Sequence, residues 1–207
     1  MSDFLKTLRE RVIVYDGAMG TSVQVRQPSV EDFWGNEGCN EILVLSRPDL
    51  IRDIHASFLR VGCDVIETDT FGSTRTVLAE YGLQDRTAEI NQAAARLAKD
   101  VANREQLYSE FLKEVGNLYF DSVNRTLHDT SQQASLITMY SLVGRIRMIS
   151  SEAVLTSAEK VAEDIVESYE RPPTTFQEFQ QSWEASNPWH EFTKACRAER
   201  QSMLGRL

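Results

Sequence analysis

The stretch Val12–Thr21, which reads VIVYDGAMGT, decides how the amino-terminal part of this chain folds. An apolar run over Val12–Tyr15 stops at the carboxylate of Asp16 and is followed by Gly17 and Gly20. This pattern predicts a β-strand that delivers an acid and a tight turn to the edge of a sheet. Because glycine takes backbone conformations that are closed to bulkier residues, we expect Gly17 and Gly20 to supply the turn.

A second strand is predicted over Asp64–Thr68, and it also ends in polar residues. Between the two runs, a helix is expected to begin at the hydroxyl cap of Ser46, with an early proline, and to end at Gly62. Strand, helix and strand in this order form a parallel, right-handed crossover unit. Since parallel strands end at the same edge of a sheet, both polar ends are expected to face one site.

The rest of the chain has helical periodicity, and no third strand follows. Helices are predicted over 74–81 and 86–103, and the apolar register of the second one allows it to continue past residue 103. Residues 104–207 are predicted to be almost purely helical. The expected fold is therefore mixed α/β and mostly helical: a partial (β/α) barrel-like unit with two parallel strands over 1–103, then an all-α, bundle-like region over 104–207.

The composition excludes several classes of protein. A hydrophobic content of 42% over 207 residues supports a real core, and the net charge of −9 argues against nucleic acids and anionic membranes as partners. No apolar run approaches the roughly 20 residues that span a bilayer, and the amino terminus does not have the form of a secretion signal. Three widely spaced cysteines, Cys39, Cys63 and Cys196, indicate reduced thiols and a cytoplasmic location rather than a disulfide framework or a zinc site.

Residues 6–103, about half of the chain, resemble the amino-terminal part of the homocysteine-binding domain of cobalamin-dependent methionine synthases. The resemblance rests on DGAMGT over Asp16–Thr21, NEILVLSRP over Asn40–Pro48 and ETDTFGST over Glu67–Thr74, in order and at family-like spacing. It implies an eight-stranded α/β barrel with homocysteine at the carboxyl ends of the strands. It also implies a thiolate held on zinc and methyl transfer from a cobalamin on a separate domain.

The resemblance assigns substrate binding to one set of positions, which comprises Asp16, Gly17, Met19, Gly20, Thr21, Glu67 and Thr68. Asp16 is implied to bind the substrate amino group, although a strand-end acid that caps the turn is the competing interpretation. The three zinc-ligand cysteines of the family, on later strands, have no counterparts here. A free thiol with a pKa of about 8.5 is mostly protonated at neutral pH, so we expect no catalytic residue, no zinc, no cobalamin and no activity in the isolated chain.

Other candidate groups have a simpler structural interpretation. Glu67 and Asp69, two residues apart on a strand end, would share a face and suit acid–base chemistry, but hydrogen bonding within the loop is favoured. His55 is expected to pack in its helix or lie on the surface. Metal binding by His55, His128 or His190 is not favoured, because no cysteine or second histidine stands nearby.

The helical half is loosely similar to helical cytosolic regions of small uncharacterised bacterial proteins. Two pieces joined without a linker indicate a gene fusion, a recombined reading frame or an assembly artefact. The alternative function is a non-enzymatic helical interaction protein of unknown partner, with a homo-oligomer as one form. Its candidate surface is a set of aromatic residues, for which a core position is favoured over a partner groove: Phe176, Phe179, Trp183, Trp189 and Phe192.

Overall fold

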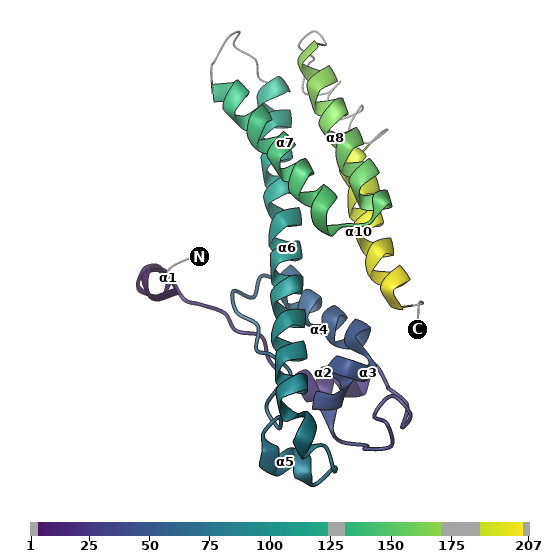
Figure 1. Ribbon diagram of the computed structural model, residues 1–207. Helices are drawn as coiled ribbons and strands as arrows, with labels where there is room; N and C mark the ends of the chain where they lie inside the picture. Colours follow the sequence, from purple (N-terminus) through teal and green to yellow (C-terminus); the bar gives the residue numbers. More distant parts are fainter. Residues whose placement is uncertain (1–3, 124–130, 171–186, 205–207) are drawn as a thin grey trace. The chain divides into compact units, whose positions relative to one another are not determined.

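The computed structural model describes residues 4–123, 131–170 and 187–204, and the chain divides into two compact units. The first unit is Met1–Glu105 and the second is Gln106–Leu207. Each unit has a hydrophobic core of its own. The helices that build them are labelled in Figure 1.

The two predicted strands do not form. Within the described residues there is no strand or sheet, only an isolated parallel bridge between Tyr15 and Val65. The barrel-like unit with two parallel strands is therefore wrong, whereas the mostly helical character is confirmed. Val12 is 81% exposed and Val14 and Tyr15 are each 50% exposed, so the predicted first strand is poorly covered. Two isolated strands cannot bury both faces or pair their outer edges, and the apolar run stays extended without a sheet.

The first unit is built from short helices. They are α1 (Phe4–Glu10), α2 (Met19–Val25), η1 (Asn40–Ile42), α3 (Leu43–Ser46), α4 (Pro48–Arg60), α5 (Arg75–Ala79) and η2 (Gln84–Arg86). Helix α4 begins with a proline in its first turn and is followed by Gly62 at φ +97°, as the sequence predicts. The predicted cap at Ser46 is wrong, because its hydroxyl donates instead to the carbonyl of Ile42 at 3.2 Å.

The core of the first unit lies between α4, the η1–α3 segment and the start of α6 (Thr87–Val123). Its fully buried side chains include Ile42, Leu43, Ile51, Ile54, Leu78 and Ile90. Helix α6 continues without a break past residue 103, as its apolar register allows. The boundary between the two units therefore falls inside a helix.

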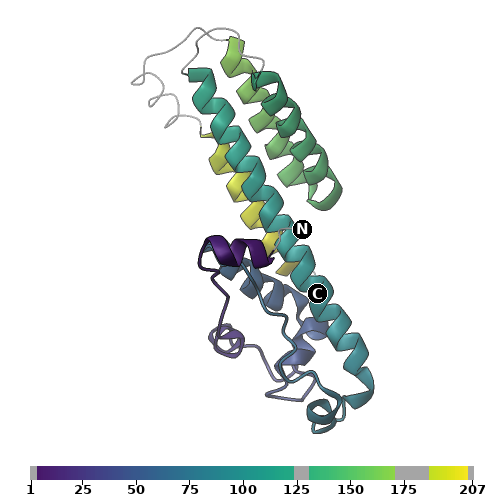
Figure 2. The same cartoon turned by 90° about the vertical axis from the view of Figure 1, so that its left-hand side faces the viewer.

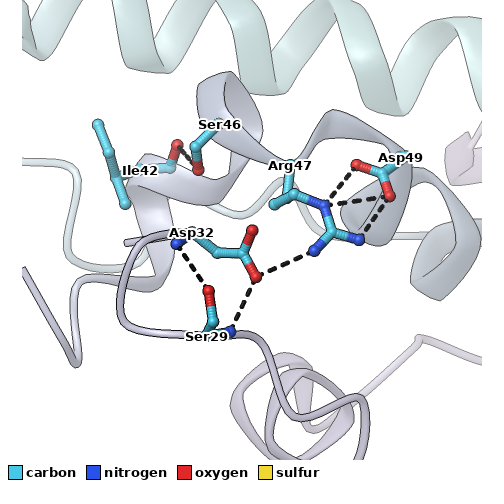
Figure 3. Close-up of polar contacts among 6 residues, drawn as sticks. All are labelled: Ser29, Asp32, Ile42, Ser46, Arg47 and Asp49. Carbon is cyan, nitrogen blue, oxygen red and sulfur yellow. Dashed lines mark hydrogen bonds and ion pairs between the residues drawn. The ribbon is translucent and has the colours of Figure 1, made fainter. Parts of the chain in front are cut away.

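Arg47 ties a surface loop to the first turn of α4 (Figure 3). Its guanidinium donates to Asp49 at 2.8 Å and to Asp32 at 3.0 Å, and Asp32 also accepts from the backbone N–H of Ser29 at 2.8 Å. These hydrogen bonds raise the pKa of Arg47. These charge-assisted hydrogen bonds fix the chain where it enters α4.

The second unit contains the later part of α6 with α7 (Ser131–Ile149), α8 (Glu152–Glu170) and α10 (Pro188–Leu204), which lie side by side in Figures 1 and 2. The core of this unit includes Leu107, Phe111, Val115, Met139, Ile146, Val154, Ala158 and Ile165. The ring of Phe192 lies 5.0 Å from that of Phe111, and Trp189 packs against the same cluster. These two aromatic residues belong to the core, as favoured. Phe176, Phe179 and Trp183 lie outside the described residues.

Candidate functional site

The candidate site surrounds the bridge between Tyr15 and Val65. One step beyond it, the Oδ1 atom of Asp16 accepts a hydrogen bond of 3.0 Å from the backbone N–H of Glu67. The backbone N–H of Asp16 in turn donates to the carbonyl of Val65 at 3.0 Å. The structure thus brings the ends of the two predicted strands together, although neither is a strand.

An exposed ion pair supports this junction from the other side. Two nitrogens of the Arg11 guanidinium contact the two carboxylate oxygens of Asp64 at 2.6 and 2.8 Å. The same carboxylate accepts from the backbone N–H of Val14 at 3.0 Å. These hydrogen bonds, that from Arg11 foremost, lower the pKa of Asp64 to about 2. A negative charge is therefore kept beside the bridge over nearly the whole accessible pH range.

The turn after Asp16 differs from the predicted one. The left-handed conformation falls on Ala18, at φ 40°, and not on Gly17 or Gly20. Helix α2 begins directly after Ala18, so Gly20 is a helical residue, and a Cβ built on it would lie 3.6 Å from the side-chain nitrogen of Asn40. The role predicted for the two glycines in the turn is wrong.

The remaining substrate-binding candidates lie in different environments. Gly17 and Thr21 are exposed, while Met19 is partly buried against the core of the first unit. Thr68 is half-buried, and its hydroxyl lies 2.8 Å from that of Thr70. These positions border the Asp16–Glu67 junction along the chain.

Glu67 and Asp69 do not share a face, because the strand that would align them is missing. Glu67 is exposed to solvent. Asp69 is only 5% exposed, and its Oδ2 atom has no hydrogen-bond partner. The predicted pair of acids on one face is therefore wrong: the acid that pairs with Asp69 comes from elsewhere.

That second acid is Glu41, which the sequence reasoning missed as a site residue. Its carboxylate is buried, and Oε1 accepts a 2.6 Å hydrogen bond from the backbone N–H of Gly72. Burial and the negative charge of Glu41 raise the pKa of Asp69 to about 7. The sequence did hold one indication of this site: Glu41 directly precedes the apolar run Ile42–Leu45. An acid next to a buried run is expected to have a hydrogen-bond or ionic partner.

The thiols and imidazoles do not assemble into a zinc site. Cys39 is buried beside Glu41, where burial raises the pKa of its thiol; Cys63 contacts the carbonyl of Tyr15; Cys196 belongs to the core of the second unit. In residues 4–123, 131–170 and 187–204, no group of three or more His, Cys, Asp or Glu side chains is arranged to hold a metal. The donors present there do not fit the zinc that the resemblance implies.

The histidines are also separated. His55 is fully buried in α4, and burial lowers its pKa to about 4, so its ring is neutral at neutral pH. His190 is exposed on α10. His128 lies outside the described residues.

The chain matches a known protein family over most of its length. A family model described as homocysteine S-methyltransferase matches residues 13–171. The chain belongs to the homocysteine S-methyltransferase family. The match starts at the first apolar run and continues past residue 103 into α8 and just beyond, so it also covers much of the helical half.

Two relatives are similar to about half of this chain. The methionine synthase of Mycobacterium tuberculosis (strain ATCC 25618 / H37Rv) is 42% identical over 102 residues, which cover 49% of this chain and 9% of that protein. The methionine synthase of Mycobacterium leprae (strain TN) is 42% identical over 102 residues, covering 49% of this chain and 8% of that protein. The chain thus spans less than a tenth of the length of these relatives. Among its described helices, none is long and apolar enough to cross a membrane.

Proposed function

We propose that residues 1–103 are a homocysteine-binding segment and that residues 104–207 form a helical region outside the ligand site. The observation that carries the proposal is the hydrogen bond from the Glu67 N–H to Asp16 Oδ1. It joins the DGAMGT and ETDTFGST motifs, which are far apart in the sequence, at one place. The family membership supports homocysteine as the ligand class.

The chemistry of the junction suits an amino acid. Homocysteine carries an ammonium group, and the half-buried carboxylate of Asp16 offers it a charge-assisted hydrogen bond. Glu67 and Thr68, which follow Ile66 next to this junction along the chain, supply a carboxylate and a hydroxyl for further polar contacts. The thiol finds no cluster of metal ligands among the described residues.

Methyl transfer requires the reactive thiolate, and a thiol with a pKa of about 8.5 is mostly protonated at neutral pH. We therefore infer that the chain binds homocysteine without transferring a methyl group by itself and holds neither zinc nor cobalamin. The unpaired cysteines suit a reducing compartment, and we infer a cytoplasmic location.

The proposal is tested by the thermal stability of the purified chain with increasing L-homocysteine, in zinc-free buffer and again with zinc. Ligand that binds only the folded state raises the melting temperature, and we expect a rise that is the same in both buffers. Asp16→Ala should abolish the rise. Asp85→Ala, which alters an exposed acid in the same unit, should leave it intact. No rise in either buffer, or methyl transfer from methylcobalamin that needs zinc, would show the proposal to be wrong.

The alternative function, an interaction protein, is favoured by the outer surface of α7. Ile137 is 71% exposed, Tyr140 54% and Met148 83%, and no charged residue stands between Ser131 and Gly144. A helix that is apolar on both sides is usually covered on both sides. Sedimentation that depends on concentration, and that Ile137→Lys converts to a single monomeric species, would support this function; a monomer at all concentrations would exclude self-association.

A further inference from the structure

The loop Thr68–Ser73, which follows the candidate site, is inverted with respect to the usual preferences of its residues. It buries the carboxyl group of Asp69 and leaves the ring of Phe71 fully exposed, at 102% of the reference area. Acids are rarely buried without a partner, and aromatic rings are rarely presented whole to water. Something must hold the loop in this arrangement.

The loop is fixed by a hydrogen bond to Glu41, which lies in the 3₁₀ turn η1. Its Oε1 atom accepts a 2.6 Å hydrogen bond from the backbone N–H of Gly72. A Cβ on residue 72 would lie 2.6 Å from that oxygen, so a larger residue would force the Glu41 carboxylate to move. The other oxygen, Oε2, lies 3.9 Å from the thiol of Cys39. The Glu41 carboxylate is thus engaged on both sides as a hydrogen-bond acceptor, which suits its ionised form.

Asp69 is placed differently. Its Oδ2 atom is buried without a hydrogen-bond partner, and the side chain is near the negative charge of Glu41. Among the described residues, the charge that acts on Asp69 is that of Glu41, and Asp69 in turn acts on the thiol of Cys39. Two buried carboxylates cannot both remain ionised at little cost, so the unpartnered acid is the one that keeps a proton.

We propose that the proton on Asp69 is a lock: while Asp69 is neutral, the loop Thr68–Ser73 stays closed against Glu41, and loss of this proton to solvent opens the loop. The lock needs no ligand, and it controls the segment that directly follows Glu67. On opening, Asp69 reaches water and the Gly72 N–H leaves Glu41. The exposed ring of Phe71 is then free to turn inward.

The pH dependence follows from linkage. The pKa of Asp69 is about 7 in the closed loop and about 3.9 in an open, solvated one. Below pH 4 both forms are protonated and the closed loop is fully favoured. Between about pH 4 and 7 only the closed form keeps the proton, so the closed population relative to the open one falls about tenfold per pH unit. Above about pH 7 the ratio levels off.

The test is amide hydrogen exchange at Gly72 in the full chain, expressed as a protection factor so that the intrinsic pH dependence of exchange is removed. A local probe is needed because His55 contributes a slope of opposite sign to global stability in the same range. We expect protection to fall up to tenfold per pH unit between pH 4 and 7. In Asp69→Asn, which has no carboxyl proton to lose, the protection factor of Gly72 should not change with pH in this range. In Glu41→Gln, the pH above which the protection factor becomes constant should be lower than in the wild type.

A direct titration keeps the proposal testable if Asp69→Asn does not fold. The carboxyl carbon of Asp69 in the wild-type chain, followed by NMR, should titrate near pH 7 together with the Gly72 amide. A pKa below 5 for Asp69 would overturn the lock. So would protection of Gly72 that stays constant from pH 4 to 7, or that falls with the same slope in Asp69→Asn.

Discussion

The Oδ1 atom of Asp16 accepts a hydrogen bond from the backbone N–H of Glu67 across 51 residues of sequence. This contact persists although the sheet that would ordinarily align the two residues is absent from the described chain. The carboxylates of Asp16 and Asp64, together with the Tyr15–Val65 bridge, therefore do the aligning that neighbouring strands do in a sheet. The DGAMGT and ETDTFGST motifs are brought together by these contacts.

Gly72→Ala should destabilise the first unit. The added methyl group would lie 2.6 Å from Glu41 Oε1, which must move and weaken its hydrogen bond to the Gly72 N–H. We expect a loss of about 1–3 kcal/mol in the free energy of unfolding measured in urea. Gly17→Ala is the matched control, because no atom lies within 4 Å of its Cβ position. Equal effects of the two substitutions would contradict the close contact.

His55 should make the chain less stable in acid. Its pKa is about 4 in the folded state and about 6.5 when unfolded, so the stability from this group is complete above pH 6.5 and is lost as pH falls toward 4. The expected slope is about 1.4 kcal/mol per pH unit. His55→Leu, of similar volume, removes two unpartnered ring nitrogens. The difference in unfolding free energy between the variant and the wild type should therefore grow as the pH is lowered; a constant difference would refute it.

The ion pair between Arg11 and Asp64 should be visible as a carboxyl titration. Asp64 has a folded pKa of about 2, below its ordinary value, so any stability it contributes is present above about pH 4 and is lost as pH falls through 2. In Arg11→Gln the pKa of Asp64 should return toward 3.8 when followed by NMR. Lys6→Gln, which alters a cation on α1, the helix that precedes Arg11, should not move it. An unchanged Asp64 titration in Arg11→Gln would mean that the guanidinium is not the cause.

Tyr108→Phe should destabilise the second unit. The Tyr108 hydroxyl donates to Glu199 Oε2 at 2.8 Å and lies 2.8 Å from the Ser150 hydroxyl, while the other oxygen of Glu199 accepts from the backbone N–H of Ser151 before α8. Removing the hydroxyl leaves a buried carboxylate short of a donor, which costs about 1–3 kcal/mol. Tyr140→Phe, on the exposed surface of α7, should change the unfolding free energy by less than about 0.5 kcal/mol. If both variants behave alike, the buried link is not stabilising.

The helices were predictable because their signals are local. Pro48 and Gly62 bracket α4, and the stripe Ile90–Val101 gives α6 its buried face. The absence of strands was not predictable, because an apolar run such as Val12–Tyr15 forms a strand only when neighbouring strands pair with its edges. The sequence shows the run and not its neighbours. Of the predicted strand pairing, the described residues show the single bridge between Tyr15 and Val65.

The site was predictable in part. The resemblance pointed to Asp16 and Glu67, and the structure joins them through one hydrogen bond. Glu41 and its contact with Gly72 were not found, because the pairing of two buried carboxyl groups depends on a tertiary contact that no spacing rule encodes. The burial of Asp69 reverses the predicted pairing with Glu67 for the same reason.

The most direct test of homocysteine binding is an NMR titration of the full chain in zinc-free buffer, with the backbone amide of Glu67 as the probe. This amide donates to Asp16, so a ligand ammonium that binds the Asp16 carboxylate must change its environment. We predict that L-homocysteine shifts the amide resonances of Glu67, Gly17 and Thr21 in a saturable way, and that Asp16→Ala abolishes the shifts. Resonances that stay unmoved, or that move only after zinc is added, would contradict a metal-free homocysteine site at this junction.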